Sequence, residues 1–284
     1  MPTIIDRILN ELPDLPKKLR VAAKFAVDRP DRMAFGSMRA VATESGVSSP
    51  TMHRLARYFD YESYDEFKTQ FQTEVAASSF STRAEKLYES RVETAAEPLL
   101  KGLQDAAREN IDAGFQNNPI ETLQAIGDTI RTARTTHIVA TGSMAWVAAH
   151  LEATGGIAFP GLRMTRSGVA SAIETLATVQ EGDAVIAIAV SPYAKSAIEA
   201  LEYARDIGVT TLAITDRRSS PLVGIACHSI IAPTNSPHYY PSVVSICSLV
   251  EAVLAFAVAD SAGGAIGRIE KVVSLRKQSG AYLE

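Results

Sequence analysis

Apolar residues recur along the first 80 positions with the spacing of short amphipathic helices. After Ser37, a residue type that caps helix amino termini, Met38, Val41 and Ala42 would share one helical face. Gly46 follows, and glycine tolerates the left-handed backbone that ends a helix. A second stripe at i, i+3, i+4 and i+7 comprises Met52, Leu55, Ala56 and Phe59. The pattern predicts two helices joined by a glycine turn, a helix-turn-helix.

Polar residues mark where the next helices begin. Ser48 or Ser49 can cap the second helix, with Pro50 in its first turn. Ser63 and Glu66 have the spacing of a capping box, which predicts a further helix. The apolar residues of that helix are Tyr64, Phe67 and Phe71. We therefore expect an all-α bundle in this part of the chain.

From residue 119 the pattern changes to continuous apolar runs separated by helical segments. A helix after Pro119 is marked by Ile120, Leu123, Ile126 and Ile130. The runs are nearly all apolar, which is typical of strands covered on both faces, and they cover residues 137–141, 184–190, 211–215 and 229–232. The segments between them, such as 194–207, are long enough for crossover helices. An α/β domain with a doubly wound parallel sheet is expected.

These patterns divide the chain of 284 residues into three parts. We expect a helix-turn-helix domain over residues 1–79, a helical linker over 80–118 that is broken near Pro98, and the α/β domain over 119–284. The longest apolar stretch, 243–259, is too short and too polar for a confident membrane span, so a buried helix and no membrane association are expected.

Charge changes this picture only when it is divided by domain. The formal net charge is −4, which argues against wholesale coating of nucleic acid. Residues 1–79, however, hold 11 basic and 11 acidic side chains, and no acidic residue occurs from Ser45 to Phe59. The face opposite the apolar stripe carries His53, Arg54 and Arg57. The helix-turn-helix is therefore neutral overall and locally basic.

A basic second helix after a glycine turn is typical of proteins that insert that helix into the DNA major groove. Arginine suits this role because its fork pairs with guanine or with phosphate. Ser48, Ser49 and Thr51 at the helix start are candidates for phosphate contacts, beside His53 and the two arginines. On spacing alone, a solvated basic face on a small helical bundle is an equal alternative.

The run from Ser37 to Arg57 resembles the amino-terminal domain of RpiR-type bacterial regulators. The following stretch from Phe59 to Phe67 and the upstream Asp28-Arg29-Pro30 also fit that family, and the resemblance covers about residues 1–77. Arg54 and Thr51 occupy the positions of the family's recognition-helix arginine and threonine. The resemblance implies that this domain binds a DNA operator.

Hydroxyl-bearing loops follow the predicted strands at the edge where ligands bind in such sheets. Hydroxyls and backbone N–H groups before helix starts suit an anionic or sugar-like ligand. The candidate ligand residues are Gly142, Ser143, Ser191, Tyr193, Lys195 and Ser196. The alternatives are that the hydroxyls only cap helices and that Tyr193 only packs in the core. Without a G-x-G-x-x-G or Walker A pattern, no nucleotide cofactor is expected.

This second domain resembles the sugar isomerase (SIS) domain, which follows the DNA-binding domain in RpiR-type regulators. The similar stretches are 213–216, 219–222 and 232–237, within residues 120–262. The resemblance implies binding of a phosphorylated sugar or related metabolite, and oligomerisation. Many members carry Ser-x-Ser-Gly-x-Thr where this chain has 189–194, so only Ser191 matches securely. In the first loop, either Ser143 or Met144 occupies the family's serine position.

Other chemistry has weak support in the sequence. No two of the five histidines have a helical metal-binding spacing, so no metal site is expected. Cys227 and Cys247 are expected to be inert buried thiols of a cytoplasmic protein, because the first residues lack a secretory pattern.

Two function classes remain open. The first is a transcriptional regulator that is not an enzyme. It would bind double-stranded operator DNA as a homodimer or homotetramer and sense a phosphorylated sugar or related carbohydrate acid. The second is a sugar-phosphate isomerase with an accessory helical domain, for which Glu251 and His238 are the candidate acid and base.

Overall fold

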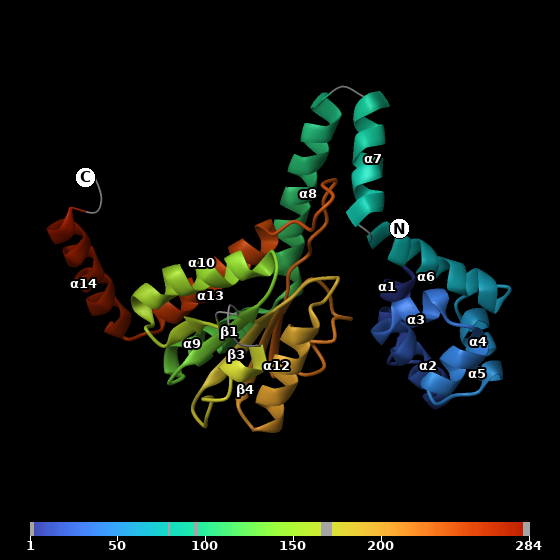
Figure 1. The fold of residues 1–284 in the computed structure, drawn as a ribbon, viewed down its shortest axis with the longest axis horizontal. Coiled ribbons are helices and arrows are strands. Elements are labelled where there is room, and N and C mark those ends of the chain that lie inside the picture. Colours follow the sequence, from blue (N-terminus) through green and yellow to red (C-terminus); the bar gives the residue numbers. More distant parts are fainter. Residues whose placement is uncertain (1–2, 79, 94–95, 166–171, 281–284) are drawn as a thin grey trace. The chain divides into compact units, whose positions relative to one another are not determined.

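The structure is a computed structural model that describes residues 3–78, 80–93, 96–165 and 172–280. The chain forms two compact units (Figure 1). The first comprises Met1–Ala95 together with His238–Tyr240, and the second comprises Ala96–Pro237 and Pro241–Glu284.

The first unit is built from helices around one apolar core. The helices are α1 (Ile4–Glu11), α2 (Lys17–Asp28), α3 (Pro30–Phe35), α4 (Met38–Glu44), α5 (Ser49–Tyr58), α6 (Tyr64–Ser78) and α7 (Phe80–Glu93). The predicted stripe of α5 is fully buried and contacts the aromatic side chains of α6, with the rings of Phe59 and Phe67 stacked 6.3 Å apart. The all-α prediction for this part of the chain is confirmed.

The turn between α4 and α5 has the geometry that its glycine predicts. Gly46 has φ +69°. Its N–H donates to the carbonyl of Thr43 (3.2 Å), and the N–H of Val47 donates to the carbonyl of Ala42 (3.0 Å). This pair of bonds is the Schellman motif, which satisfies the last carbonyls of α4. At the other end of α4, the Ser37 hydroxyl accepts from the N–H of Ala40 (3.2 Å), as expected of a cap.

The capping box predicted for α6 is only half formed. The Ser63 hydroxyl accepts from the N–H of Glu66 (3.1 Å), but the Glu66 carboxylate accepts from the N–H of Glu62 (2.8 Å) instead of Ser63. The Ser63 hydroxyl thus satisfies one free donor of the helix start, whereas the Glu66 carboxylate binds the residue before the cap. The prediction of a helix that begins here is confirmed. The prediction of a full capping box is wrong, because the Glu66 carboxylate does not accept from the N–H of Ser63.

The second unit contains a parallel five-stranded sheet in the order β2-β1-β3-β4-β5. Its strands are β1 (Thr136–Ala140), β2 (Leu162–Met164), β3 (Ala184–Ile188), β4 (Thr210–Thr215) and β5 (His228–Ile231). Four of them match the predicted runs. The sequence gives no apolar run for β2, because it has three residues and the exposed Arg163 at its centre.

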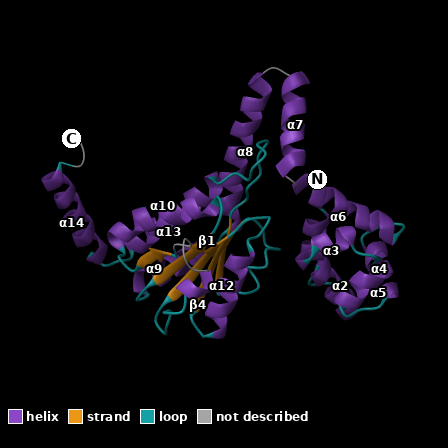
Figure 2. Ribbon diagram, in the orientation of Figure 1, coloured by secondary structure: helices purple, strands orange, loops and turns teal. Residues whose placement is uncertain are grey.

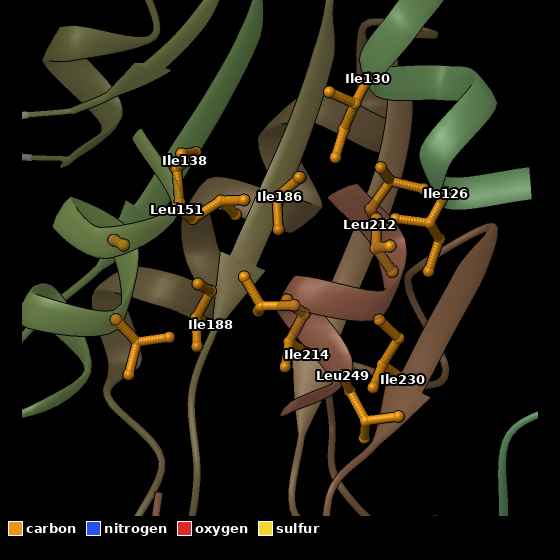
Figure 3. Close-up of a cluster of buried hydrophobic side chains, with 14 of the residues drawn as sticks. Ile126, Ile130, Ile138, Leu151, Ile186, Ile188, Leu212, Ile214, Ile230 and Leu249 are labelled. Atoms are coloured by element: carbon orange, nitrogen blue, oxygen red, sulfur yellow. The ribbon is translucent and has the colours of Figure 1, made fainter. Parts of the chain in front are cut away.

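Helices cover both faces of this sheet, as doubly wound folds require (Figure 2). One face packs against α9 (Ile120–Thr132), α10 (Met144–Ala158) and α13 (Val244–Ala259), with Ile138, Ile186 and Leu212 in its core (Figure 3). The other face packs against α12 (Lys195–Asp206) and the segment that follows the short α11 (Ala172–Thr175).

Two further helices complete the second unit. In α8 (Ala96–Asn117), Pro98 lies in the first turn, where its missing N–H costs no helical hydrogen bond. The predicted break near Pro98 therefore does not occur at the proline, and residues 94–95 before it lie outside the described part of the chain. The last helix is α14 (Gly264–Ser279). Within the described ranges, no single helix is long and apolar enough to cross a membrane; α13 and α14 pass that test only as a bent pair.

Candidate DNA-binding and ligand-binding sites

The exposed face of α5 carries the basic residues that the sequence assigns to it. His53, Arg54 and Arg57 are all exposed, while Leu55 and Ala56 between them are fully buried. This alternation follows from the helical period, which turns the polar positions away from the core. An exposed basic surface on the second helix of a helix-turn-helix has the position and charge needed to enter a major groove.

At the amino terminus of α5, the structure agrees with the expected exposure of two of the three candidate hydroxyl residues, and Thr51 is the exception. Ser48 is exposed and Ser49 is half-buried, so both remain available for a phosphate contact. Thr51, in contrast, is only 2% exposed. Its hydroxyl lies 3.0 Å from that of Ser48 and accepts from Nη2 of Arg54 (3.3 Å). The burial of Thr51 does not favour a direct phosphate contact.

Two features of α5 have no counterpart among the predicted site residues. Tyr58 is 39% exposed and lies on the same side of the helix as Arg54 and Arg57. The signal in the sequence was its spacing of four residues from Arg54, which places both side chains on one helical face. At the end of the helix, Nη2 of Arg7 donates to the carbonyl of Phe59 (3.1 Å). A cation at the carboxyl end of a helix is favoured by the helix dipole, so Arg7 helps to hold α5 in place.

The strand order locates the ligand-binding edge of the second unit. In the order β2-β1-β3-β4-β5, β2 is added on one side of β1 and the later strands are added on the other side, so the winding of the parallel sheet switches between β1 and β3. Ligands bind beyond the carboxyl ends of the strands at such a switch point. The loop after β1 contains Gly142, with φ +58°, and the half-buried Ser143. Met144 is 3% exposed and packs in the core. Of these two residues, Ser143 is therefore the one that lies at the loop surface.

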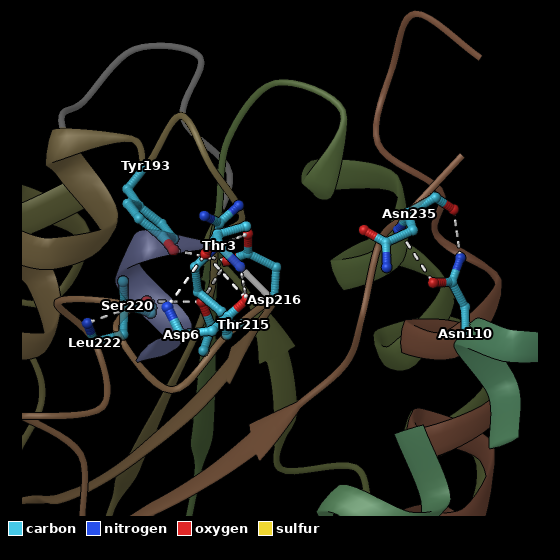
Figure 4. Close-up of polar contacts among 10 residues, drawn as sticks. Thr3, Asp6, Asn110, Tyr193, Thr215, Asp216, Ser220, Leu222 and Asn235 are labelled. Carbon is cyan, nitrogen blue, oxygen red and sulfur yellow. Dashed lines mark hydrogen bonds and ion pairs between the residues drawn. The ribbon is translucent and has the colours of Figure 1, made fainter. Parts of the chain in front are cut away.

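The loop after β3 contains Ser191 and Tyr193, both half-buried. The Tyr193 hydroxyl donates to Oδ1 of Asp216 (2.8 Å), at the end of β4 (Figure 4). Burial raises the pKa of Tyr193, and the neighbouring Asp216 carboxylate raises it further. Asp216 also accepts from Nε of Arg217 (3.0 Å). The phenol thus ties the loop after β3 to the loop after β4, which was one of the two roles left open for it.

Asp216 also lies at this edge of the sheet, although it is not among the candidate ligand residues predicted from the sequence. It is buried, and the neighbouring Thr215 hydroxyl donates to that of Ser220 (2.7 Å). Its position directly after the predicted strand 211–215 was the feature of the sequence that could have identified it.

Lys195 and Ser196 begin α12 at the same edge. Ser196 is half-buried in the first turn. The Lys195 side chain is 88% exposed, and its Nζ lies 3.1 Å from Oε1 of Glu199, one turn along the helix. An exposed pair of this kind contributes little to stability, so it leaves the ammonium able to turn toward a ligand. The loop after β2 includes residues 166–171, which lie outside the described part of the chain.

A second polar cluster lies at the opposite, amino-terminal edge of the sheet. Oδ2 of the buried Asp183 accepts from Nη2 of Arg134 (2.6 Å) and from the N–H of Gln180 (3.1 Å), and lies 3.6 Å from Nε2 of His137. Burial opposes ionisation of Asp183, but these hydrogen bonds outweigh it and lower its pKa. Burial lowers the pKa of His137.

The remaining candidates do not assemble a catalytic or metal site. Glu251 is 69% exposed on α13, 3.9 Å from Nε2 of His150, and His238 is exposed. Among the described residues, no three His, Cys, Asp or Glu side chains are grouped so as to hold a metal ion. The expectation of two buried thiols is wrong, because Cys227 is exposed at the sheet edge and Cys247 is half-buried.

Comparisons with known proteins agree with both units. The family model of the SIS domain matches residues 165–259. The HTH-type transcriptional regulator HexR of Pseudomonas aeruginosa is 25% identical over 253 residues, which are 88% of this chain and 86% of that protein. HexR of Escherichia coli is 22% identical over 87% of this chain and 84% of its own length.

Two solved structures have similar folds. The sugar isomerase domain of an RpiR transcription factor from Sphaerobacter thermophilus matches 62% of this chain and 98% of its own, with 27% identity and a TM-score of 0.57. The NanR protein of Vibrio vulnificus, complexed with ManNAc-6P, matches 96% of this chain and 98% of its own, with 17% identity and a TM-score of 0.55. Residues 165–259 thus match the SIS domain, and together with the basic helix-turn-helix and the doubly wound sheet these comparisons support an RpiR-type transcriptional regulator with a SIS domain.

Proposed function

We propose that this regulator binds operator DNA through α5, and that a phosphorylated sugar or related carbohydrate acid at the carboxyl edge of the sheet changes its operator affinity. The DNA-binding half rests on one observation above all. The exposed face of α5 is basic and free of acidic side chains, and follows a Schellman turn that orients it against α4. Such a protein acts where the chromosome is, which places it in the cytoplasm.

The test of this half compares two arginines. Arg54→Ala removes a fork on the exposed face of α5, whereas Arg108→Ala removes an exposed arginine from α8 in the other unit. Both variants change the net charge equally. We expect Arg54→Ala to abolish sequence-selective binding in a gel shift and Arg108→Ala to retain it. Undiminished selectivity in Arg54→Ala would contradict the assignment.

The ligand-binding half is supported by the chemistry of the switch point. The hydroxyls of Ser143 and Ser191 lie in the loops that follow β1 and β3, and helices α10 and α12 begin at the same edge. Free N–H groups at helix amino termini favour anions, and hydroxyls favour sugar or phosphate oxygens. The NanR structure is a complex with a phosphosugar, which agrees with this ligand class.

Thermal shift with a panel of sugar phosphates and sugar acids tests the ligand class. Ser143→Ala and Ser191→Ala should each weaken the effect of the best ligand. Ser248→Ala is the matched control, because it removes the hydroxyl of a serine on α13 that is half-buried, as Ser143 and Ser191 are. Equal ligand responses in all three variants would place the ligand elsewhere.

We infer that ligand binding reaches the DNA-binding unit through α8. The side chain of Asn110 and the backbone of Asn235 are joined by two hydrogen bonds, of 2.6 and 3.0 Å (Figure 4). Asn118 binds Ile231 at the end of β5 in the same way, through two bonds of 2.8 Å. The helix that follows the first unit in the chain is thus fastened to the ligand-binding edge. Asn110→Ala should bind the ligand but show a smaller change of operator affinity.

A homodimer or homotetramer is part of the proposal. Large apolar side chains are more than half exposed on α10 and α14, namely Trp146, Ile266 and Leu275. Exposed apolar groups of this size are typical of protein interfaces. A two-fold dimer would present two copies of α5 to the half-sites of a pseudo-palindrome. Sedimentation velocity should give at least twice the mass of 30.4 kDa.

We further propose that the chain is not an isomerase, although the SIS fold also occurs in enzymes. A general base with a raised pKa is expected to be buried near substrate. Glu251 and His238, the candidate acid and base, are both exposed. Turnover of an aldose or ketose phosphate by the purified protein would contradict this proposal.

A further inference from the structure

The hydroxyl of Thr51 connects the start of α5 to the basic face of the same helix. It lies 3.0 Å from the Ser48 hydroxyl on one side and accepts from Nη2 of Arg54 at 3.3 Å on the other. One hydroxyl can accept two hydrogen bonds and donate one, so both contacts are compatible with a single rotamer. Since Thr51 is 2% exposed, its side chain is part of the protein interior.

This arrangement restricts a side chain that is otherwise free to move. Arg54 is exposed and lies one helical turn after Thr51, the spacing at which side chains of a helix meet. An arginine that binds a base through both arms of its fork must give up most of its rotamer freedom. A contact that already orients the guanidinium in free protein lowers that entropic cost.

We propose that Thr51 is a positioning residue for DNA recognition, acting through the guanidinium of Arg54 and not through a phosphate contact of its own. The inference rests on the proposed operator binding. It replaces the direct phosphate role that the sequence suggested for Thr51. Its consequence is that Thr51 affects discrimination between sequences more than general attraction to DNA, because phosphate contacts give affinity and base contacts give specificity.

The test uses the full chain and an operator selected from random duplexes by the wild-type protein. Thr51→Val removes the hydroxyl at nearly constant volume, and Thr51→Ser keeps it. By fluorescence anisotropy, we expect Thr51→Val to lose about three- to tenfold in operator affinity, the cost of ordering one flexible side chain. Its affinity for an unrelated duplex should change less than twofold. Thr51→Ser should stay within twofold of wild type for both duplexes.

Two further readouts separate positioning from a structural or phosphate-binding role. In an Arg54→Ala background, Thr51→Val should have no additional effect, since its partner is gone. The slope of log affinity against log salt should also be unchanged, because no phosphate contact is lost. An equal loss in the Arg54→Ala background, or a salt slope smaller by about one unit, would overturn the proposal.

A measurement without DNA protects the test against a failure of folding. Nitrogen-15 relaxation of the Arg54 Nε–H group should show greater mobility in Thr51→Val than in wild type, with the Arg57 group unchanged. Thr51→Ala replaces Thr51→Val if the latter does not fold. If Arg54→Ala binds the operator like wild type, the proposed function fails; if Arg54→Ala loses the operator but Thr51→Val binds it like wild type, this inference alone fails.

Discussion

The side-chain amide of Asn118 completes the hydrogen bonding of a strand at the edge of the sheet. Nδ2 donates to the carbonyl of Ile231 (2.8 Å) and Oδ1 accepts from the N–H of the same residue (2.8 Å). Because β5 is the last strand in the sheet, these two groups have no further strand beside them. Nδ2 also donates to the carbonyl of Gly114 (2.6 Å). One buried amide thus supplies what a neighbouring strand would.

The cost of removing it follows from the groups left behind. Asn118→Ala leaves the N–H and C=O of the buried Ile231 without these partners. A buried backbone group without a partner costs about 1–3 kcal/mol, so the loss of both partners should cost about 2–6 kcal/mol. Asn118→Asp should cost more at neutral pH, because a carboxylate would face two carbonyl oxygens. Acidification that protonates it should recover part of the loss.

Urea denaturation followed by far-UV circular dichroism measures these differences. Gln116→Ala, an exposed change two residues earlier, is the control and should stay within about 0.5 kcal/mol of wild type. A loss below about 1 kcal/mol for Asn118→Ala, or an aspartate variant as stable as wild type, would refute the reasoning.

Three other predictions concern the glycine turn before α5, the polar cluster around Asp183, and Tyr193. Gly46→Ala should cost about 1 kcal/mol from its φ of +69° alone, since the space beside it is open, and Gly46→Asn should cost less in urea denaturation. The pKa of Asp183 is lowered on folding, so the stability that its carboxylate contributes is present above its ordinary pKa of 3.8 and is lost as pH falls through the folded pKa. Asp183→Asn should therefore lower the Tm at pH 7, and the Tm of this variant should decrease less than that of wild type as the pH is lowered. Tyr193→Phe should cost about 1–3 kcal/mol, and much less in an Asp216→Ala background, which has no acceptor for the phenol; additive losses would contradict the hydrogen bond.

The sequence predicted those parts of the fold that depend on local pattern. The stripe from Met52 to Phe59 follows from helical spacing, and the Schellman turn from the position of Gly46. Strand β2 could not be found, because its three residues pair with β1 through a contact between distant segments. The break expected near Pro98 falls on residues 94–95, between α7 and α8, which lie outside the described residues. Pro98 itself lies in the first turn of α8, where a proline does not disturb a helix.

The candidate sites show the same division. Exposure of His53, Arg54 and Arg57 follows from the apolar stripe on the opposite face of α5. The hydrogen bond between Tyr193 and Asp216 does not, because it joins two loops that only the parallel sheet brings together. The burial of Thr51 also depends on tertiary packing. A threonine in the first turn of a helix can be exposed or buried, so the sequence alone did not indicate it.

The central claim is that a ligand at the carboxyl edge of the sheet changes the affinity of α5 for its operator. Its most direct test is the operator Kd, measured by fluorescence anisotropy with and without the sugar phosphate that gives the largest thermal shift. Coupling of ordinary size predicts a change of about fivefold or more in the wild-type protein, and none in a Ser143→Ala, Ser191→Ala double variant. An operator Kd that saturating ligand leaves unchanged in the wild-type protein would contradict the account.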